Sequence, residues 1–293
     1  MEGNILSFEQ KLNKFHEVLN ERPVCSILNR EGTFPVLLTA EHASCFIPDF
    51  LDGLGLDENT LYQKHYAYDI GVYELTKRVA EILNAPAIVN NYSRLIIDVV
   101  RLKDHPTSIS TEQDGQVIYG NIHISDEEKE FRYRSIHEVW HNTIRDFQKI
   151  HQRPVIIPIH TYSKSVDFDQ FGRPGYGVLR PLYSFVFERY IDHDLAQALK
   201  ESLIKQGVDE TDISFNDPYD FTELPNSICT SYRNTGASLV VYETRNDLTH
   251  DGDYRVKPEK IEKQAHLIAE TIKNGFEKFH NDNPVQNGEK FCA

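Results

Sequence analysis

Reactive side chains follow strand-like apolar runs at three places in the sequence. His42 follows PVLLTAE, His160 follows PVIIPI, and Glu243 follows ASLVVY. Groups at the last residues of buried strands emerge at the carboxyl edge of an α/β sheet, so we expect these side chains to meet in a cleft. Two imidazoles and a carboxylate are what a water-activating zinc hydrolase needs, as metal ligands and as a base.

Each histidine also has an ordinary interpretation, because a single His after a strand most often stabilises a turn. Small or hydroxyl residues follow both histidines, in HAS and in HTYS, and this recurrence favours metal ligation. His42 and His160 lie far apart in the sequence, so a zinc site that they share must be assembled from distant segments. A shared cation requires the rings of His42 and His160 to lie within about 10 Å of each other.

Asp69, in the segment HYAYDIG, is the candidate third metal ligand. It precedes an expected helix from Val72, where a carboxylate that caps the helix N-terminus would be ordinary. The functional alternative is a His, carboxylate, His ligand set that leaves one position for water. His65 could be an outer donor or a replacement ligand, and Asp98 is a further alternative to Asp69.

Arg94 and Arg101 lie in the segment YSRLIIDVVR and are candidates for binding a substrate carboxylate. Arginine does this better than lysine because its planar guanidinium donates two parallel hydrogen bonds. If the segment is a strand, Arg94 and Asp98 share one face, and a salt bridge between such neighbours is the structural alternative.

Glu243 also has two possible roles. It can be a structural partner of Arg245, or it can be the general base. A partly apolar pocket would raise its pKa, so that it could accept a proton from water and return it to the leaving nitrogen.

The periodicity of apolar residues predicts alternating helices and strands, and therefore a mixed α/β fold in three layers. Pro158 is expected at a strand end or on a side without a ladder partner, and Pro258 suits the first turn of the last helix. The expected helices are Phe8–Leu19, Val72–Leu83, Asp126–Ile150, Leu182–Gln206 and Glu259–Phe279; the expected strands are Val36–Ala40, Ala87–Asn90, Leu95–Val100, Val155–Ile159 and Leu239–Tyr242, with turns over Ile213–Phe221.

Length and composition favour one α/β domain over residues 31–280, with an N-terminal helical appendage over 1–30 and a disordered tail over 281–293. The net charge of −14 opposes binding to nucleic acids or to an anionic membrane. An anionic substrate would need a local group of basic residues, for which Arg94, Arg101, Arg173 and Arg180 are the candidates. The four cysteines show no CxxC spacing, and no apolar run reaches the roughly 18 to 20 residues of a membrane span. We therefore expect a cytoplasmic protein; its oligomeric state stays open.

Seven blocks occur in an order and spacing that resemble the N-formylglutamate amidohydrolase family over residues 35–270. They are EHAS with the following IP, HYAYDIG, YSRLIIDVVR, IHTYS, GYGVL, FNDPYD and YETRNDL. The resemblance implies a zinc-exopeptidase-like (phosphorylase/hydrolase-like) α/β/α fold with a mixed central sheet. It also implies an enzyme that hydrolyses an amide beside a free carboxylate in a small molecule.

The resemblance further implies roles for individual residues. His42, Asp69 and His160 match the ligands of one zinc ion, and Glu243 matches the general base. The substrate-binding candidates are Arg94, Arg101, Asn216, Tyr219 and Arg245, and Arg101 is also a catalytic candidate that stabilises the oxyanion.

Three departures from the family pattern concern the substrate pocket. Val100 stands where an Asn is expected, Thr161 and Tyr162 replace Ser and Phe, and Asp217 follows Asn216 where a Glu is usual. The sequence therefore indicates metal-dependent amide hydrolysis of an N-formyl or N-acyl amino acid more firmly than formylglutamate itself.

Two alternatives stay open at this point. One is a catalytically silent small-molecule binding protein on the same fold. The other is a metal-dependent carboxypeptidase or deacylase with a larger substrate. The polar loop from Lys164 to Tyr176 could be a lid over either kind of substrate.

Overall fold

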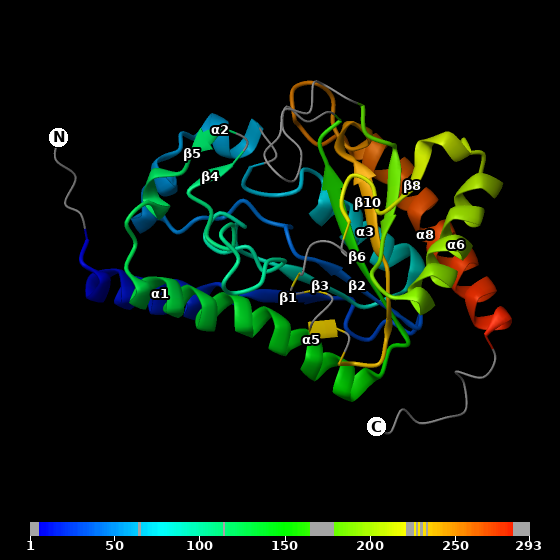
Figure 1. Cartoon of the computed structure of the whole chain (residues 1–293), viewed down its shortest axis with the longest axis horizontal. Coiled ribbons are helices and arrows are strands. Elements are labelled where there is room, and N and C mark those ends of the chain that lie inside the picture. Colours follow the sequence, from blue (N-terminus) through cyan, green and yellow to red (C-terminus); the bar gives the residue numbers. More distant parts are fainter. Residues whose placement is uncertain are drawn as a thin grey trace.

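The computed structural model describes residues 6–63, 66–113, 115–164, 179–220 and 234–283, together with positions 226, 228, 231 and 232. Helices cover both faces of a central sheet (Figure 1). The predicted three-layer α/β/α class with a mixed sheet is confirmed.

Eight strands form the central sheet in the described part of the chain. They are β1 (Cys25–Leu28), β2 (Val36–Ala40), β3 (Ala87–Asn90), β6 (Val155–Tyr162), β7 (Tyr183–Val186), β8 (Ile213–Phe215), β9 (Ser238–Leu239) and β10 (Val241–Arg245). Their order is β1-β3-β2-β6-β10-β7-β8, and β9 also pairs with β6. The neighbours from β3 to β10 run parallel, whereas β1 and β7 pair antiparallel with β3 and β10. The carboxyl ends of β2, β6 and β10 therefore meet at one edge of the sheet.

The sheet residues alternate between two hydrophobic cores on opposite faces. In β2, Val36 and Leu38 belong to one core and Leu37 to the other, and in β6 Ile157 and Ile156 divide in the same way. A strand with both faces covered requires this period of two.

The helices supply the two outer layers. α3, α6 and α8 pack in the first core, and α5 packs in the second together with Phe15 of α1 (Figure 1). The helices are α1 (Phe8–Glu21), α2 (Glu58–Gln63), α3 (Val72–Leu83), α4 (Asp126–Arg132), α5 (Glu138–His151), α6 (Tyr190–Lys205) and α8 (Pro258–Asp282). Shorter elements are η1 (Asp49–Gly55), η2 (Tyr119–Asn121), η3 (Tyr133–His137), η4 (Glu210–Asp212) and η5 (Asn246–Leu248), with a separate hairpin of β4 (Glu112–Gln113) and β5 (Gln116–Val117).

Several predicted elements have the expected bounds. β2, α3 and β3 begin and end where the periodicity predicts, and Pro258 occupies the first turn of α8. The predicted helix Asp126–Ile150 is present as α4 and α5, joined by the π-helical segment η3.

Other predicted elements are wrong. Leu95–Val100 forms turns rather than a strand, and the predicted helix Leu182–Gln206 begins only at Tyr190, because β7 precedes it. The predicted turn Ile213–Phe221 opens with the strand β8. These short strands escape periodicity because few residues carry their pattern.

Pro158 lies in the middle of β6, so of its two expected positions the one beside a gap in the ladder is found. On this side of β6, β9 pairs with residues up to Ile156 and β10 pairs with residues from Ile159 onward. The ladder therefore has the predicted gap at Pro158. The neighbouring strand is interrupted at Val240, between β9 and β10. A residue without an N–H is tolerated where its neighbour forms no ladder.

The N-terminal helix α1 contacts the main body through Phe15, whose ring packs on Phe50 and Phe131. Helix α8 continues through the first two residues of the predicted C-terminal tail, and positions 284–293 lie outside the described residues. The domain boundaries stay predictions.

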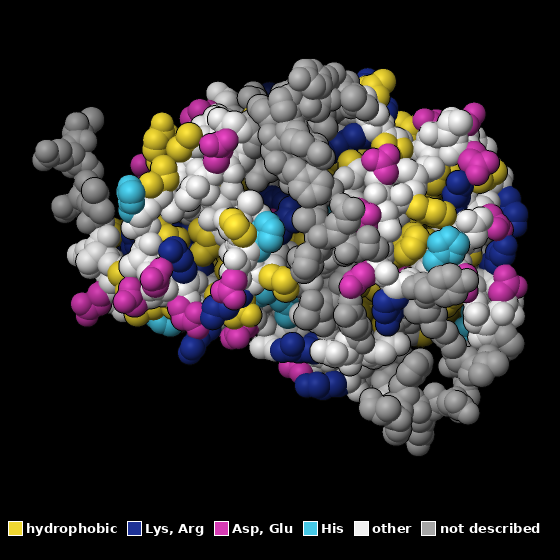
Figure 2. Space-filling model, viewed as in Figure 1, with side chains coloured by type: hydrophobic (Ala, Val, Ile, Leu, Met, Phe, Trp, Pro, Cys, Tyr) yellow, Lys and Arg dark blue, Asp and Glu magenta, His cyan; other side chains and the backbone are white. Residues whose placement is uncertain are grey.

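On the face shown in Figure 2, acidic and basic side chains are interspersed over the described surface. Within the described residues, no helix combines the length and apolar character that crossing a membrane requires. Cys25 and Cys45 are free thiols, whereas Cys229 and Cys292 lie outside the described residues. The cytoplasmic location stays a prediction.

Candidate metal centre

His42, Asp69 and His160 come together at the carboxyl edge of the sheet. All three are buried, and one ligand atom from each lies within 4.8 Å of the others. The two imidazole rings have centroids 5.0 Å apart, well inside the limit for a shared cation. The structure thus assembles a buried His, carboxylate, His group that could hold a metal ion.

Backbone contacts hold the segments of this group in place. The amide of Asp69 donates to the carbonyl of His42 at 2.9 Å, and the amide of Thr161 donates to the Asp69 carboxylate at 3.2 Å. Asp69 is not a helix cap, because the N-cap of α3 is Gly71 and forms no side-chain cap. The ordinary interpretation of Asp69 is therefore wrong, and its carboxylate turns toward the two histidines.

A second carboxylate orients each histidine through its Nε2 atom. His42 Nε2 lies 2.8 Å from Asp98 Oδ1, and His160 Nε2 lies 3.0 Å from Glu41 Oε2. A hydrogen bond at Nε2 fixes the imidazole tautomer and leaves the Nδ1 lone pair for a metal. Asp98, considered above as an alternative ligand, supports His42 instead. His65 lies outside the described residues.

The donor atoms of the group fit a zinc ion. His42 Nδ1 is buried, has no hydrogen-bond partner in the described structure, and lies 3.5 Å from Asp69 Oδ1. His160 Nδ1 lies 2.9 Å from Asp69 Oδ2. Ligands on a tetrahedral zinc stand about 3.3 Å apart, so both separations suit a shared cation.

Charge is balanced around His160. Burial alone lowers its pKa, but hydrogen bonds to Asp69 and Glu41 raise the pKa well above the usual value for histidine. For Glu41, burial raises the pKa, and contact with His160 lowers it overall. The imidazolium between two carboxylates therefore carries a proton where a cation could bind.

Glu243 lies beside this group, because it is the register partner of His160 in the parallel pair β10 and β6. Its side chain is buried, and Oε2 has no hydrogen-bond partner among the described residues. Burial raises the pKa of Glu243 to about 7. Such a carboxyl group can exchange a proton near neutral pH.

Arg94 and Asp98 form an ion pair with Arg94 Nη2 2.8 Å from Asp98 Oδ2. Residues four apart in a strand lie about 13 Å apart, so the turns over this segment create the contact. Burial lowers the pKa of Arg94, but Asp98 and Asp69 outweigh it and raise the pKa overall. Arg101 is more exposed, with Nε 3.9 Å from Asp98 Oδ2.

The remaining predicted substrate residues already have protein partners. Arg245 donates to both carboxylate oxygens of Asp247, and the Asn216 side chain accepts from the amide of Phe187. The hydroxyl of Tyr219 accepts from Arg180 at 3.4 Å. The substrate roles of Arg245, Asn216 and Tyr219 stay predictions.

The sequence analysis missed the network behind His160. Glu41 Oε1 accepts from Thr39 at 2.7 Å and from Tyr232 at 2.8 Å, and all three side chains are buried. Thr39 in β2 and Glu41, directly after the strand, lie on either side of Ala40, and this alternation is a signal of a polar site on one sheet face. Tyr232 is distant in sequence and carries no such signal.

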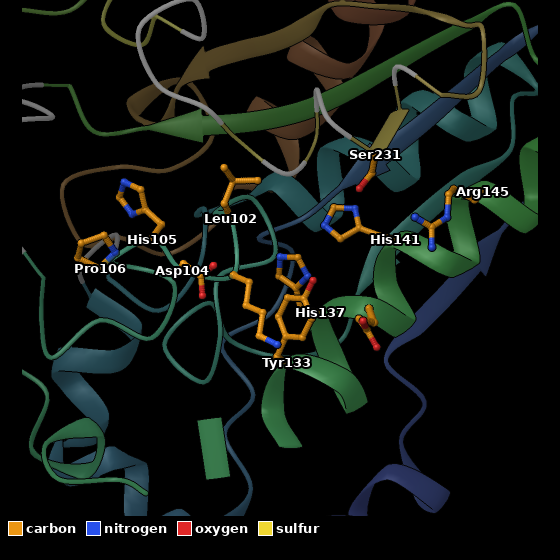
Figure 3. Close-up of a pocket in the computed structure, with 11 residues that line it drawn as sticks. Leu102, Asp104, His105, Pro106, Tyr133, His137, His141, Arg145 and Ser231 are labelled. Carbon is orange, nitrogen blue, oxygen red and sulfur yellow. The ribbon is translucent and has the colours of Figure 1, made fainter. Parts of the chain in front are cut away.

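A cavity of about 560 Å³ is lined by the segment Leu102–Pro106 and by side chains of η3 and α5 (Figure 3). His137 and His141 line it, and their Nε2 atoms bond the carbonyls of Arg101 and Val99. The segment that carries Asp98 therefore contacts both His42 and the two histidines that line the cavity.

The fold and the site define an α/β protein with a candidate metal-dependent hydrolytic centre. Comparison with protein families gives a match to the N-formylglutamate amidohydrolase model over residues 34–249. The chain therefore belongs to the N-formylglutamate amidohydrolase family, and the resemblance found in its sequence is confirmed. It is a hydrolase that acts on C–N bonds, and its family acts on small molecules.

Solved structures show the same fold. A gene product of Agrobacterium tumefaciens is 21% identical with a TM-score of 0.73, and the match covers 88% of this chain and 96% of that one. An N-formylglutamate amidohydrolase from Ralstonia eutropha is 14% identical with a TM-score of 0.57, and the match covers 88% of this chain and 99% of that one. A search of curated proteins found no match.

Proposed function

We propose that the protein is a zinc-dependent amidohydrolase that cleaves an N-formyl or N-acyl group from a carboxylate-bearing amino acid. The proposed substrate is similar to N-formylglutamate. The observation that carries the proposal is the buried group of His42, Asp69 and His160 with Glu243 beside it. Membership of the family supports the reaction class.

In the proposed site, His42 and His160 bind zinc through Nδ1, and Asp69 supplies a carboxylate oxygen. When bound, the ion supplies Lewis-acid polarisation of the substrate carbonyl and makes water more acidic. Asp98 and Glu41 hold the imidazoles in the required tautomer.

Glu243 is the proposed general base. Its unpartnered Oε2 accepts a proton from the attacking water, and the same carboxyl group then donates it to the departing nitrogen. The raised pKa, about 7 in the zinc-free protein, suits a group that performs both transfers. The products are a short carboxylic acid and an amino acid.

Arg101 is the proposed oxyanion partner, because it is the more exposed of the two predicted arginines, with 26% of its side chain exposed against 14% for Arg94. The ion pairs of Arg94 with Asp98 and Asp69 support a role in orienting the carboxylates of the site.

The test pairs elemental analysis of the purified protein with amine release from a panel of N-formyl and N-acyl amino acids. We expect about one zinc per chain and turnover that a chelator abolishes and zinc restores. Protein that binds no zinc and releases no amine would instead support a silent binding protein. Trimming of short peptides would support the carboxypeptidase alternative.

A further inference from the structure

We infer that Arg180, one of four arginines that the sequence offers for an anionic substrate, is the arginine that binds a free carboxylate of the substrate. The inference rests on the proposed function and adds its specificity residue. It stands on the partners of the arginines, on the stacking of the Arg180 guanidinium, and on the anchoring of its backbone.

Arg180 differs from the other described arginines near the candidate metal centre in its hydrogen-bond and ion-pair partners. Arg173 lies outside the described residues. Arg94 and Arg101 share Asp98, and Arg245 is held by Asp247. By contrast, no described carboxylate forms an ion pair with Arg180, and its buried Nε has no hydrogen-bond partner in the described structure. A desolvated donor without a partner costs free energy that an incoming carboxylate would recover.

Two aromatic rings hold the Arg180 guanidinium. It lies 5.4 Å from the ring centroid of Tyr162 and 5.4 Å from that of Tyr219, and Nη1 donates to the Tyr219 hydroxyl at 3.4 Å. Contacts with aromatic faces fix the plane of a guanidinium without consuming its charge. The fork of donors is therefore oriented before a ligand arrives.

The backbone at Arg180 is fixed from three directions. Its amide donates to the carbonyl of Lys164 at 3.1 Å, and its carbonyl accepts from Arg245 Nη1 at 2.9 Å. The hydroxyl of Tyr162 donates to the carbonyl of Pro181 at 2.9 Å. Arg245, at the end of β10, is therefore a positioning residue for Arg180.

These contacts place Arg180 at the carboxyl ends of β6 and β10, which also carry His160 and Glu243. The charge of Arg180 lowers the pKa of Glu243, an effect that burial outweighs. A carboxylate on Arg180 would thus set the adjacent amide of a small amino-acid derivative beside the proposed base.

The experiment measures ligand affinity in the zinc-loaded Glu243→Gln enzyme, where turnover does not interfere. The probes are N-formyl-L-glutamate and its two monoamides, N-formyl-L-glutamine and N-formyl-L-isoglutamine. Arg180→Gln is compared with Arg180→Lys, and Arg78→Gln, which removes an exposed guanidinium paired with Glu262, is the control. Circular dichroism and zinc content verify that each variant is folded.

We expect Arg180→Gln to weaken N-formyl-L-glutamate binding by about 10- to 100-fold, with a smaller loss for Arg180→Lys and none for Arg78→Gln. One of the two monoamides should bind equally to the Glu243→Gln enzyme with and without Arg180→Gln. The carboxylate that this monoamide lacks is the one that Arg180 binds. Equal losses for all three probes, no loss at all, or no binding to the parent would overturn the inference.

Turnover is scored separately with Glu243 intact. An enzyme that releases no amine from any N-acyl amino acid, yet shows the affinity pattern above, would refute the proposed hydrolysis and leave Arg180 as a carboxylate-binding residue.

Discussion

Glu243 lies beside His160 on the neighbouring strand, as its register partner in the parallel pair β10 and β6. A candidate base and a candidate metal ligand thus share one rigid support at the carboxyl edge. Because both come from central strands, their separation does not depend on a loop conformation.

The first prediction concerns this pair. Replacing Glu243 with Gln should preserve zinc content and lower kcat by about 10²- to 10⁴-fold, because the amide cannot accept the proton. Steady-state kinetics and elemental analysis of the same preparation provide the measurement. A kcat within twofold of the parent would exclude Glu243 as the base.

The same substitution should stabilise the zinc-free protein at alkaline pH. The folded pKa of about 7 lies above the ordinary value of 4.5, so the folded state binds the proton more tightly than the unfolded state does. This contribution is present below pH 4.5 and is lost as pH rises through 7. Above that pH the buried charge costs about 3 kcal/mol, which Gln removes.

Urea unfolding of chelator-treated protein at pH 5 and pH 8 tests this directly. The gain in free energy of unfolding for Glu243→Gln should be larger at pH 8. An equal gain at both values would mean that Glu243 is not a high-pKa group in the folded protein.

Zinc binding should release about one proton from His160. In the zinc-free protein its raised pKa keeps the ring charged between Glu41 and Asp69. A metal bond at Nδ1 requires that a ring proton leave, so zinc affinity should rise with pH. Calorimetry in buffers of different ionisation enthalpy gives the proton count, and a count of zero would contradict this assignment.

Glu41→Gln should weaken zinc binding by about 10- to 100-fold, because a neutral amide supports the imidazole less well than a carboxylate does. Competition with a chromogenic chelator measures the affinity. Glu262→Gln, which alters an exposed glutamate of α8, is the matched control. Unchanged zinc affinity in Glu41→Gln would show that Glu41 does not support the metal site.

Much of this site could be predicted because its chemistry lies at strand ends. His42, His160 and Glu243 each follow an apolar run, and parallel strands bring such ends together. For Arg180 the sequence indicates only one of four candidate arginines, because Tyr162, Tyr219 and Lys164 define its surroundings only after folding. The residues next to Arg180 in the sequence do not reveal that its buried Nε has no hydrogen-bond partner in the described structure.

The segment Leu95–Val100 shows where periodicity fails. Its β-branched residues are typical of a strand, yet the segment forms turns. The buried Arg132 donates to the carbonyl of Ile96 at 3.1 Å, and His141 bonds the carbonyl of Val99 at 2.9 Å. These contacts from a distant helix satisfy carbonyls that a strand would have paired in a ladder.

The π turn η3 lets one long helix brace that segment at two places. Arg132 lies before the turn, His137 is its last residue, and His141 lies after it. Each residue of an α-helix advances about 100° around the axis. If the same residues formed a regular α-helix, the residues after η3 would be rotated around the axis by roughly one residue step, and the imidazoles would turn away from the carbonyls they hold, so that Asp98 would lose its scaffold. The π turn, more than thirty residues after Asp98 in the sequence, thus contributes to the orientation of the His42 imidazole.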